Sequence, residues 1–128
     1  MIDLKTVSPN AVYAEHCRRG ELAYQVDVGT GAAVFYPRVM APGTGNLLEW
    51  RVSKGLGTVY ATTAVANRNA LSHNVALIDL DEGFRMMSRV EDIDAAAVTI
   101  GLRVRVRMAP GEGEMPPYPV FVPAGAGA

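Results

Sequence analysis

The chain has few cysteines, lysines and aromatic residues, and each shortage argues against a class of protein. Cys17 is the only cysteine among 128 residues, so no disulfide forms within the chain and a secreted, disulfide-stabilised domain is not supported. With only two lysines, 7% aromatic residues and a net charge of −1, the chain has no general attraction for nucleic acid or anionic lipid. No apolar run reaches membrane-spanning length and the N-terminus lacks a signal-peptide pattern, so we expect a cytoplasmic protein.

The chain has enough apolar residues to build a core by burial alone. Hydrophobic residues make up 49% of the sequence, and 128 residues suit one compact domain with a small appendage. A chain of this size can therefore fold without disulfides or a metal ion.

The first 21 residues predict one short amphipathic helix. Ser8 is a helix-capping residue, Pro9 suits the first helical position, and Gly20 is a typical stop, which places the helix over about 9–19. Its apolar face carries Val12, Tyr13, His16 and Cys17. This face could cover the chain's own barrel, a partner, or a second copy of the chain.

Residues 22–47 form a distinct segment in which short apolar stretches alternate with glycine and proline. This composition predicts two tight turns joined by short strands rather than a helix.

From residue 48 onward the pattern is β, and residues 48–123 predict a five-stranded barrel of the OB type. Alternating and β-branched segments indicate strands at 48–52, 57–67, 74–80, 84–90, 102–108 and, more briefly, 120–122. A short helical connection over 92–98 lies between the fourth and fifth strands, as an OB barrel requires. Residues 81–83 predict a hairpin turn, and the tail 124–128 is expected to be disordered.

An ordered set of short motifs then identifies a family resemblance over roughly residues 10–123. The motifs are Tyr24-Gln25, Gly31, Phe35-Tyr36-Pro37-Arg38, Pro42, Gly45, Leu48-Glu49-Trp50, Gly57-Thr58-Val59-Tyr60, Val75–Gly83, Ile100–Val104 and Pro119-Val120-Phe121. In this order they resemble the zinc-ribbon/OB-fold proteins known as domain of unknown function thirty-five. The resemblance implies a mainly β fold with an N-terminal helix, rubredoxin-like zinc-ribbon hairpins over 22–47, and the OB barrel.

The same resemblance implies a structural zinc site that this chain has lost. Family members carry two cysteine pairs, and the corresponding positions here are Asp27 and Thr30, then Ala41 and Thr44. Four thiolates at that spacing form a tetrahedral zinc site, whereas alanine has no donor atom and threonine hydroxyls are poor zinc ligands. We therefore expect a degenerate ribbon with no metal, its turns held by packing of Tyr24, Phe35, Tyr36 and Leu47.

The resemblance also implies a role in acyl-CoA metabolism. Family members associate with thiolase-fold enzymes or with enoyl-CoA hydratase-like proteins, as scaffolds or as contributors to an acyl-CoA site. The chain is expected to be a non-catalytic accessory protein of this kind, with no cofactor and with a homodimer as one possible state. No nucleophile with a neighbouring acid or base is visible in the sequence.

The residues themselves offer few catalytic or metal-binding candidates. Cys17 lies on the apolar helix face, where it is expected to pack as a small hydrophobe. His73 falls in a predicted loop with no visible partner. Asp79, Asp81 and Glu82 gather three carboxylates that could hold a hard cation, but their sequence is explained by the hairpin turn.

Arginines are the main candidates for binding. Arg103, Arg105 and Arg107 alternate with inward-facing Leu102, Val104, Val106 and Met108, so they form an outward ridge. With Arg38, they are candidates for contact with the nucleotide part of CoA or with an acidic partner, and the alternative is a solvated face that discourages edge pairing.

Binding of single-stranded nucleic acid is the alternative function, although a nucleic-acid partner is not favoured. OB barrels use basic grooves with stacking aromatic residues for this purpose. Tyr60, Arg51, Arg85 and Arg89 could lie near one another on the barrel and form such a groove.

Overall fold

The computed structural model describes residues 8–65 and 73–125, and it begins with the predicted helix. Helix α1 spans Pro9–Arg18, and the Ser8 hydroxyl caps it by accepting a hydrogen bond from the Ala11 amide. Gly20 follows in the left-handed conformation that glycine adopts most easily (φ 78°). Within the described residues, no helix is both long and apolar enough to span a membrane.

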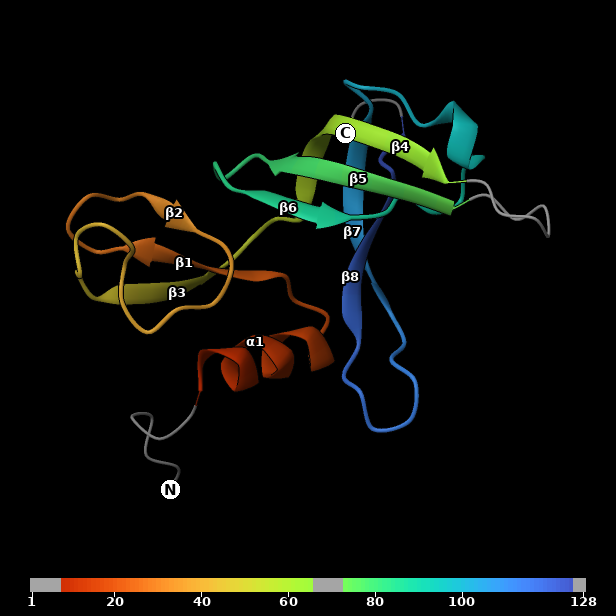
Figure 1. The fold of residues 1–128 in the computed structure, drawn as a ribbon. Helices are drawn as coiled ribbons and strands as arrows, with labels where there is room; N and C mark the ends of the chain where they lie inside the picture. The colour runs from red at the N-terminus through yellow and green to blue at the C-terminus, as the bar shows by residue number, and fades with distance from the viewer. Residues whose placement is uncertain (1–7, 66–72, 126–128) are drawn as a thin grey trace.

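A small antiparallel sheet follows the helix, and we call it the N-terminal sheet. It contains β1 (Ala23–Asp27), β2 (Ala33–Val34) and β3 (Leu48–Val52), in the order β2-β1-β3. Figure 1 shows it beside the larger sheet, with α1 alongside it. The sequence places residues 48–52 in the barrel, and this is wrong: β3 pairs along its length with β1, from Ala23–Val52 to Asp27–Leu48.

The second sheet is the predicted OB barrel. Its strands are β4 (Leu56–Val65), β5 (His73–Leu80), β6 (Arg85–Ser88), β7 (Arg103–Ala109) and β8 (Tyr118–Pro123), in the order β6-β5-β4-β7-β8. A parallel bridge between Val90 and Phe121 joins the two ends of this order. The Phe121 amide donates to the Arg89 carbonyl, and the Glu91 amide donates to the Phe121 carbonyl, so the sheet curls into a barrel.

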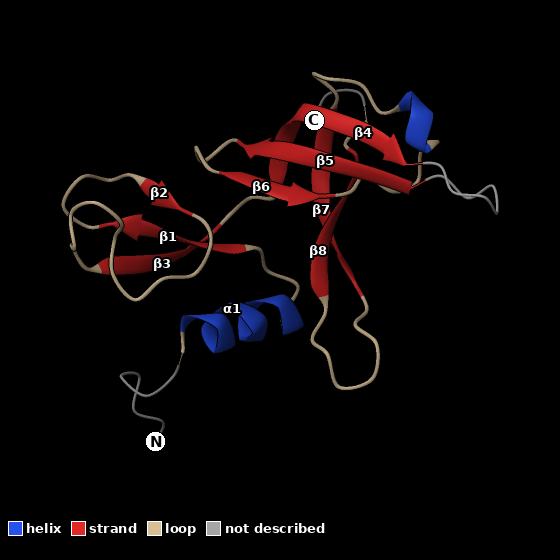
Figure 2. Ribbon diagram, in the orientation of Figure 1, coloured by secondary structure: helices blue, strands red, loops and turns tan. Residues whose placement is uncertain are grey.

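The five-strand count is therefore right, but the membership differs. β8 is the fifth barrel strand, whereas the prediction counts residues 48–52 as the first. The helical connection is a single 3₁₀ turn, η1 (Ala95–Ala97), capped by Asp94, and it lies between the third and fourth barrel strands. Figure 2 shows that α1 and η1 are the helical elements of the described chain and that strands form the rest of the framework.

Two further predictions concern the ends of strands. The hairpin turn at residues 81–83 is confirmed, with Gly83 at φ 100° and its amide donating to the Leu80 carbonyl. Three predicted stretches lie outside the described residues: residues 66–67 of the second strand, residues 67–72 of the loop predicted over 67–73, and residues 126–128 of the disordered tail.

The barrel encloses the main core, and this core continues into the N-terminal sheet. Ile78, Val104 and Phe121 have no exposed surface. Phe84 stacks on both Tyr24 of β1 and Phe35, with ring centroids 4.8 and 5.0 Å away. On β7, Val104 is buried and Val106 and Met108 pack against the core, as does Leu102 just before the strand, so the predicted inward alternation is confirmed. The aromatic stack holds the two sheets together, since such pairs contribute about 0.5–1.5 kcal/mol beyond burial.

Candidate functional site

A mostly apolar groove of about 580 Å³ lies where α1, the N-terminal sheet and the barrel meet. Side chains from α1, from the segment after β2, and from β5, β6 and β8 line it: Asn10, Tyr13, Phe35, Tyr36, Pro37, Asn74, Val75, Met86, Met87, Ser88, Arg89, Tyr118, Pro119 and Val120. Tyr36 and Met87 are 58% and 61% exposed, so the groove opens to solvent along an apolar rim. Such a groove suits an apolar ligand or an apolar side chain of a partner.

Asn74 forms the polar floor of this groove. It is buried, and its Nδ2 donates to the Thr62 hydroxyl (2.6 Å) and to the Thr63 carbonyl (3.3 Å). Its Oδ1 accepts from the Val90 amide at 3.0 Å, next to the barrel's closing bridge. The Asn74 side chain is thus fully engaged within the chain and serves the fold rather than a ligand.

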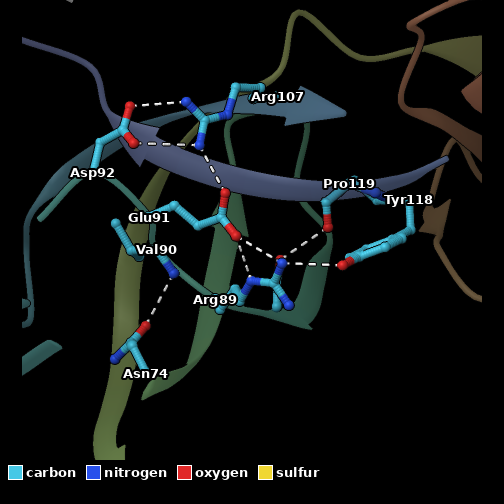
Figure 3. Close-up of polar contacts among 9 residues, drawn as sticks. Asn74, Arg89, Val90, Glu91, Asp92, Arg107, Tyr118 and Pro119 are labelled. Carbon is cyan, nitrogen blue, oxygen red and sulfur yellow. Dashed lines mark hydrogen bonds and ion pairs between the residues drawn. The ribbon is translucent and has the colours of Figure 1, made fainter. Parts of the chain in front are cut away.

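A chain of ion pairs runs from the groove rim across the barrel seam. Arg89 donates to the Tyr118 hydroxyl (3.0 Å) and to Glu91 (2.7 Å), as Figure 3 shows. The other oxygen of Glu91 accepts from Arg107 at 2.7 Å, and Arg107 also contacts Asp92 at 2.8 Å. The hydrogen bond from Arg107, joined by the one from Arg89, lowers the pKa of Glu91 despite partial burial.

The four candidate arginines do not form one cationic surface. Arg103 makes a bidentate pair with Asp81 (2.8 and 2.9 Å), and Arg107 is paired as described above. Arg105 and Arg38 are exposed, and neither side chain makes an ion pair within the described residues. The backbone of Arg38 is fixed, because its amide and carbonyl both bond to the buried Gln25 side chain. Arg38 and Arg105 are therefore the arginines of the predicted set that are open to a ligand or partner.

The three carboxylates near the hairpin turn bind different groups. Asp79 pairs with Arg85 and Asp81 with Arg103, and the hydrogen bond from Arg103 lowers the pKa of Asp81. Glu82 accepts from the Ser53 hydroxyl and the Lys54 amide. The turn interpretation is thus confirmed. In the described part of the chain, no group of three or more His, Cys, Asp and Glu side chains is arranged to hold a metal ion.

The positions predicted as lost zinc ligands lie in two turns of the N-terminal sheet. Asp27 is buried, and its Oδ1 accepts from the amides of Gly29 (2.8 Å) and Thr30 (3.2 Å). The Thr44 hydroxyl donates to Oδ2 (2.8 Å), and Asn46 Nδ2 donates to Oδ1 (3.0 Å). Burial raises the pKa of Asp27, but these four hydrogen bonds outweigh it and bring the pKa to about 2.

The predicted packing of these turns is only half right. Tyr24 and Phe35 are buried in the core, whereas Tyr36 is 58% and Leu47 73% exposed. The hydrogen bonds of the Asp27 carboxylate join the turns where the sequence predicted apolar packing.

The remaining single-residue candidates show no catalytic arrangement. Cys17 is buried, as predicted, and burial raises the pKa of its thiol, so it is a poor nucleophile. His16 contacts Glu21 at 2.9 Å rather than the cysteine. His73 begins β5, so its predicted place in a loop is wrong, and its side chain lies outside the described part of the structure.

The residues proposed for nucleic-acid binding are divided between the two sheets. Arg85 covers the Tyr60 ring, with its guanidinium carbon 3.4 Å from the ring centroid. Arg51 lies on β3 of the N-terminal sheet, and Arg89 is engaged by Glu91 and Tyr118. The exposed Tyr60 face is thus occupied by an arginine instead of being free to stack on a base.

Comparison with known proteins gives a consistent result for the fold. Residues 50–109 match the family model described as ChsH2, C-terminal OB-fold domain. A chain of the solved Ltp2-ChsH2(DUF35) aldolase is similar with a TM-score of 0.80 and 22% identity, over 97% of this chain and 98% of that chain. A DUF35-family protein of unknown function from Sulfolobus solfataricus is similar with a TM-score of 0.64 and 13% identity, over 80% of each chain. No curated protein sequence matches the chain.

Proposed function

We infer that this chain, which contains an OB-fold domain of the ChsH2 C-terminal family, is the non-catalytic accessory subunit of an enzyme that acts on acyl-CoA. The resemblance to the domain of unknown function thirty-five, predicted from the sequence, is confirmed. The observation that carries the proposal is the likeness to a chain of the Ltp2-ChsH2(DUF35) aldolase, which covers 97% of this chain, the N-terminal sheet as well as the barrel. The thiolase-like or hydratase-like nature of the partner comes from the family resemblance.

The chemistry of the described residues supports a binding role. The arginines near the groove, Arg89 and Arg107, are neutralised by carboxylates, and the thiol of Cys17 is buried. Neither a nucleophile with a base beside it nor a pair of carboxylates with separated pKa values stands in the groove as described. The partner would then supply the catalytic groups.

The loops of the N-terminal sheet are the surface that we propose for the partner. Val39 is 75% and Leu47 73% exposed, and Val28 and Met40 are each 57% exposed. Arg38 directly precedes Val39 and Met40 in the chain, and its side chain makes no ion pair within the described residues. Interfaces combine exposed apolar and aromatic side chains with arginine in this way.

Affinity capture of the full chain from its native host, with mass spectrometry of the proteins recovered, tests the proposal. We expect a thiolase-like or hydratase-like acyl-CoA enzyme, and co-expression with that enzyme should give a complex whose mass is measured by light scattering. Light scattering of the chain alone also reports whether it forms a homodimer. Recovery of no acyl-CoA enzyme would contradict the proposal.

A matched pair of variants locates the contact surface. Leu47→Glu places a charge among the exposed apolar residues of the N-terminal sheet and should weaken the complex about tenfold or more. Ile100→Glu makes the same kind of change at a residue of nearly the same exposure, 72%, next to the barrel, and should leave the complex intact. Equal effects of both substitutions would place the contact elsewhere.

The groove is the proposed place for the acyl group. Titration calorimetry with an acyl-CoA and with free CoA should show tighter binding of the acylated form, because the groove lining is apolar. Met87→Glu, in the groove, should remove this difference, whereas Met115→Glu, at a similarly exposed methionine outside it, should not. Equal binding of both ligands by the unaltered protein would rule out an acyl site in the groove.

A further inference from the structure

The two turns of the N-terminal sheet have the same hydrogen-bond pattern. In the first turn the Asp27 amide donates to the Ala32 carbonyl, and the Gly31 amide donates to the Asp27 carbonyl. In the second turn the Ala41 amide donates to the Asn46 carbonyl, and the Gly45 amide donates to the Ala41 carbonyl. The spacing of donors and acceptors along the chain is identical, so the turns are equivalent position by position.

Side chains and backbone angles extend this equivalence. The Thr30 hydroxyl accepts from the Ala32 amide at 3.2 Å, and the Thr44 hydroxyl accepts from the Asn46 amide at 3.1 Å. Gly31 and Gly45 both adopt positive φ angles, 78° and 70°. The first and fourth positions of each turn are Asp27 and Thr30, and Ala41 and Thr44.

The donor set at these four positions does not fit a zinc ion. Ala41 has no donor atom, and the Thr44 hydroxyl already donates a hydrogen bond to Asp27. The Asp27 carboxylate accepts four hydrogen bonds, three at Oδ1 and one at Oδ2, and a metal ion would have to compete with these donors for its oxygens. One carboxylate and two hydroxyls that are already bonded make a poor zinc site.

The two turns differ at their first position, which is Asp27 in one turn and Ala41 in the other. Asp27 is buried and reaches from its own turn to the second, where Thr44 and Asn46 donate to it. Ala41, also buried, has no polar side chain at the matching position. We propose that the Asp27 carboxylate replaces the structural zinc ion implied by the family resemblance, joining the two turns through hydrogen bonds instead of metal–ligand bonds.

Electrostatics favour a carboxylate at this position in place of a zinc ion. The carboxylate carries a negative charge, and all four of its partners are N–H or O–H donors, two from the backbone of the first turn and two from side chains of the second. Hydrogen bonds to a charged group are stronger than neutral ones, and a buried charge needs several of them. The low pKa of Asp27 agrees with a carboxylate that stays ionised at neutral pH.

Metal analysis and chelation test whether the two turns are held together without zinc. Protein produced in zinc-supplemented medium should contain no stoichiometric zinc, and EDTA should not change its thermal unfolding. Trp50, the only tryptophan, lies on β3 opposite Gln25 of β1, so its fluorescence reports on the N-terminal sheet. Zinc near one ion per chain, or loss of the native Trp50 signal in EDTA, would overturn the proposal.

Hydrogen exchange tests whether the Asp27 carboxylate stabilises the turns through its hydrogen bonds. Asp27→Ala should speed exchange of the Gly29 and Thr30 amides by about tenfold or more, since both lose a charged acceptor. Asp79→Ala, which removes a carboxylate from an exposed barrel pair, should leave these amides unchanged. If Asp27→Ala unfolds the sheet, the Trp50 signal records it and the result still supports the proposal. Unchanged exchange in Asp27→Ala would overturn it.

Two further variants separate the hydroxyl from side-chain size. Thr44→Val removes the donor to Asp27 Oδ2 and should also speed exchange in the first turn, whereas Thr44→Ser keeps the donor and should not. The variant with cysteine at all four positions should regain one zinc ion per chain, with the cobalt form showing thiolate charge-transfer absorption. Equal behaviour of the two Thr44 variants, or no metal uptake by the four-cysteine variant, would show that Asp27 does not occupy the position of a metal.

Discussion

Single buried polar side chains hold the parts of this molecule together, and Asn74 is the clearest case in the barrel. Its amide joins β4 to β5 and also accepts from the Val90 amide beside the closing bridge. Asn74→Ala should lower the free energy of unfolding by about 1–3 kcal/mol, because the buried Val90 amide loses its acceptor. Urea denaturation measures this change.

Thr62→Val is the control for Asn74, because it removes only one of the three hydrogen bonds. Its effect on the urea midpoint should be smaller, since Asn74 keeps its bonds to Thr63 and Val90. An Asn74→Ala variant as stable as the unaltered protein would show that water replaces the lost acceptor.

The low pKa of Asp27 predicts a specific pH dependence of stability. Four hydrogen bonds outweigh the effect of burial and lower this pKa to about 2, from an ordinary value of 3.8. The unfolded chain therefore binds the proton more readily than the folded one. The stability that Asp27 contributes is complete above pH of about 4.5 and is lost as the pH falls toward about 2.

The comparison of the unaltered protein with Asp27→Asn isolates this contribution from other carboxylates. The difference in unfolding free energy, followed by Trp50 fluorescence, should be constant from neutral pH to about pH 4.5 and should shrink below it. A difference that stays constant down to about pH 2 would mean that Asp27 is not the titrating group.

At the scale of elements, the seam of the barrel depends on few backbone hydrogen bonds and on the ion pairs beside them. Glu91 lies between Arg89 and Arg107 and donates its own amide to the Phe121 carbonyl across the seam. Glu91→Gln should increase exchange of the Glu91 and Phe121 amides severalfold. The loss of stability should be small, about 1 kcal/mol, because the side chain is partly exposed.

Glu49→Gln is the matched control for this change. Glu49 pairs with Arg51 on β3, away from the seam, and both side chains are more than half exposed. Exchange at the seam should be unaffected in this variant. If Glu91→Gln also left it unaffected, the backbone bridge alone would close the barrel.

The strands themselves could be predicted from sequence, but their pairing could not. Alternation and turn residues located β4 to β8 to within a few residues, because a half-buried strand requires that pattern. The same pattern in residues 48–52 predicts a strand but does not indicate which sheet the strand joins, and in the structure it pairs with β1 and not with the barrel. Register with a distant strand depends on tertiary contacts that a local pattern does not contain.

The contacts of the candidate site residues also depend on tertiary structure that the sequence does not show. Asp27, Thr30, Ala41 and Thr44 were identified as a set by resemblance, but the sequence did not indicate that one carboxylate links them. The repeated Gly-Thr-Gly of residues 29–31 and 43–45 was the available signal, because it marks two equivalent turns. The ion pairs of Arg103 and Arg107 were also missed, since their carboxylates lie 22 and 15–16 residues away in sequence.

At the scale of the whole molecule, one polar side chain joins the barrel to the segment that leads into it from the N-terminal sheet. Glu82, in the β5–β6 turn, accepts from the Ser53 hydroxyl at 2.7 Å and from the Lys54 amide at 2.8 Å. Both donors lie in the segment that joins β3 to β4, and the Ser53 amide also bonds to the Leu22 carbonyl before β1. Glu82 thus anchors the segment between the two sheets to the barrel, and together with the Tyr24–Phe84–Phe35 stack it orients the proposed partner surface relative to the groove.

Glu82→Ala should therefore loosen the two sheets relative to each other while each stays folded. Residual dipolar couplings of the unaltered protein should fit a single alignment tensor, and those of Glu82→Ala should require one for each sheet. Partner binding should weaken severalfold, because a surface that was held in place must be ordered on binding. Glu112→Ala, which removes an exposed carboxylate from the β7–β8 loop, should behave as the unaltered protein. A single tensor for Glu82→Ala would mean that the Tyr24–Phe84–Phe35 stack alone sets the orientation.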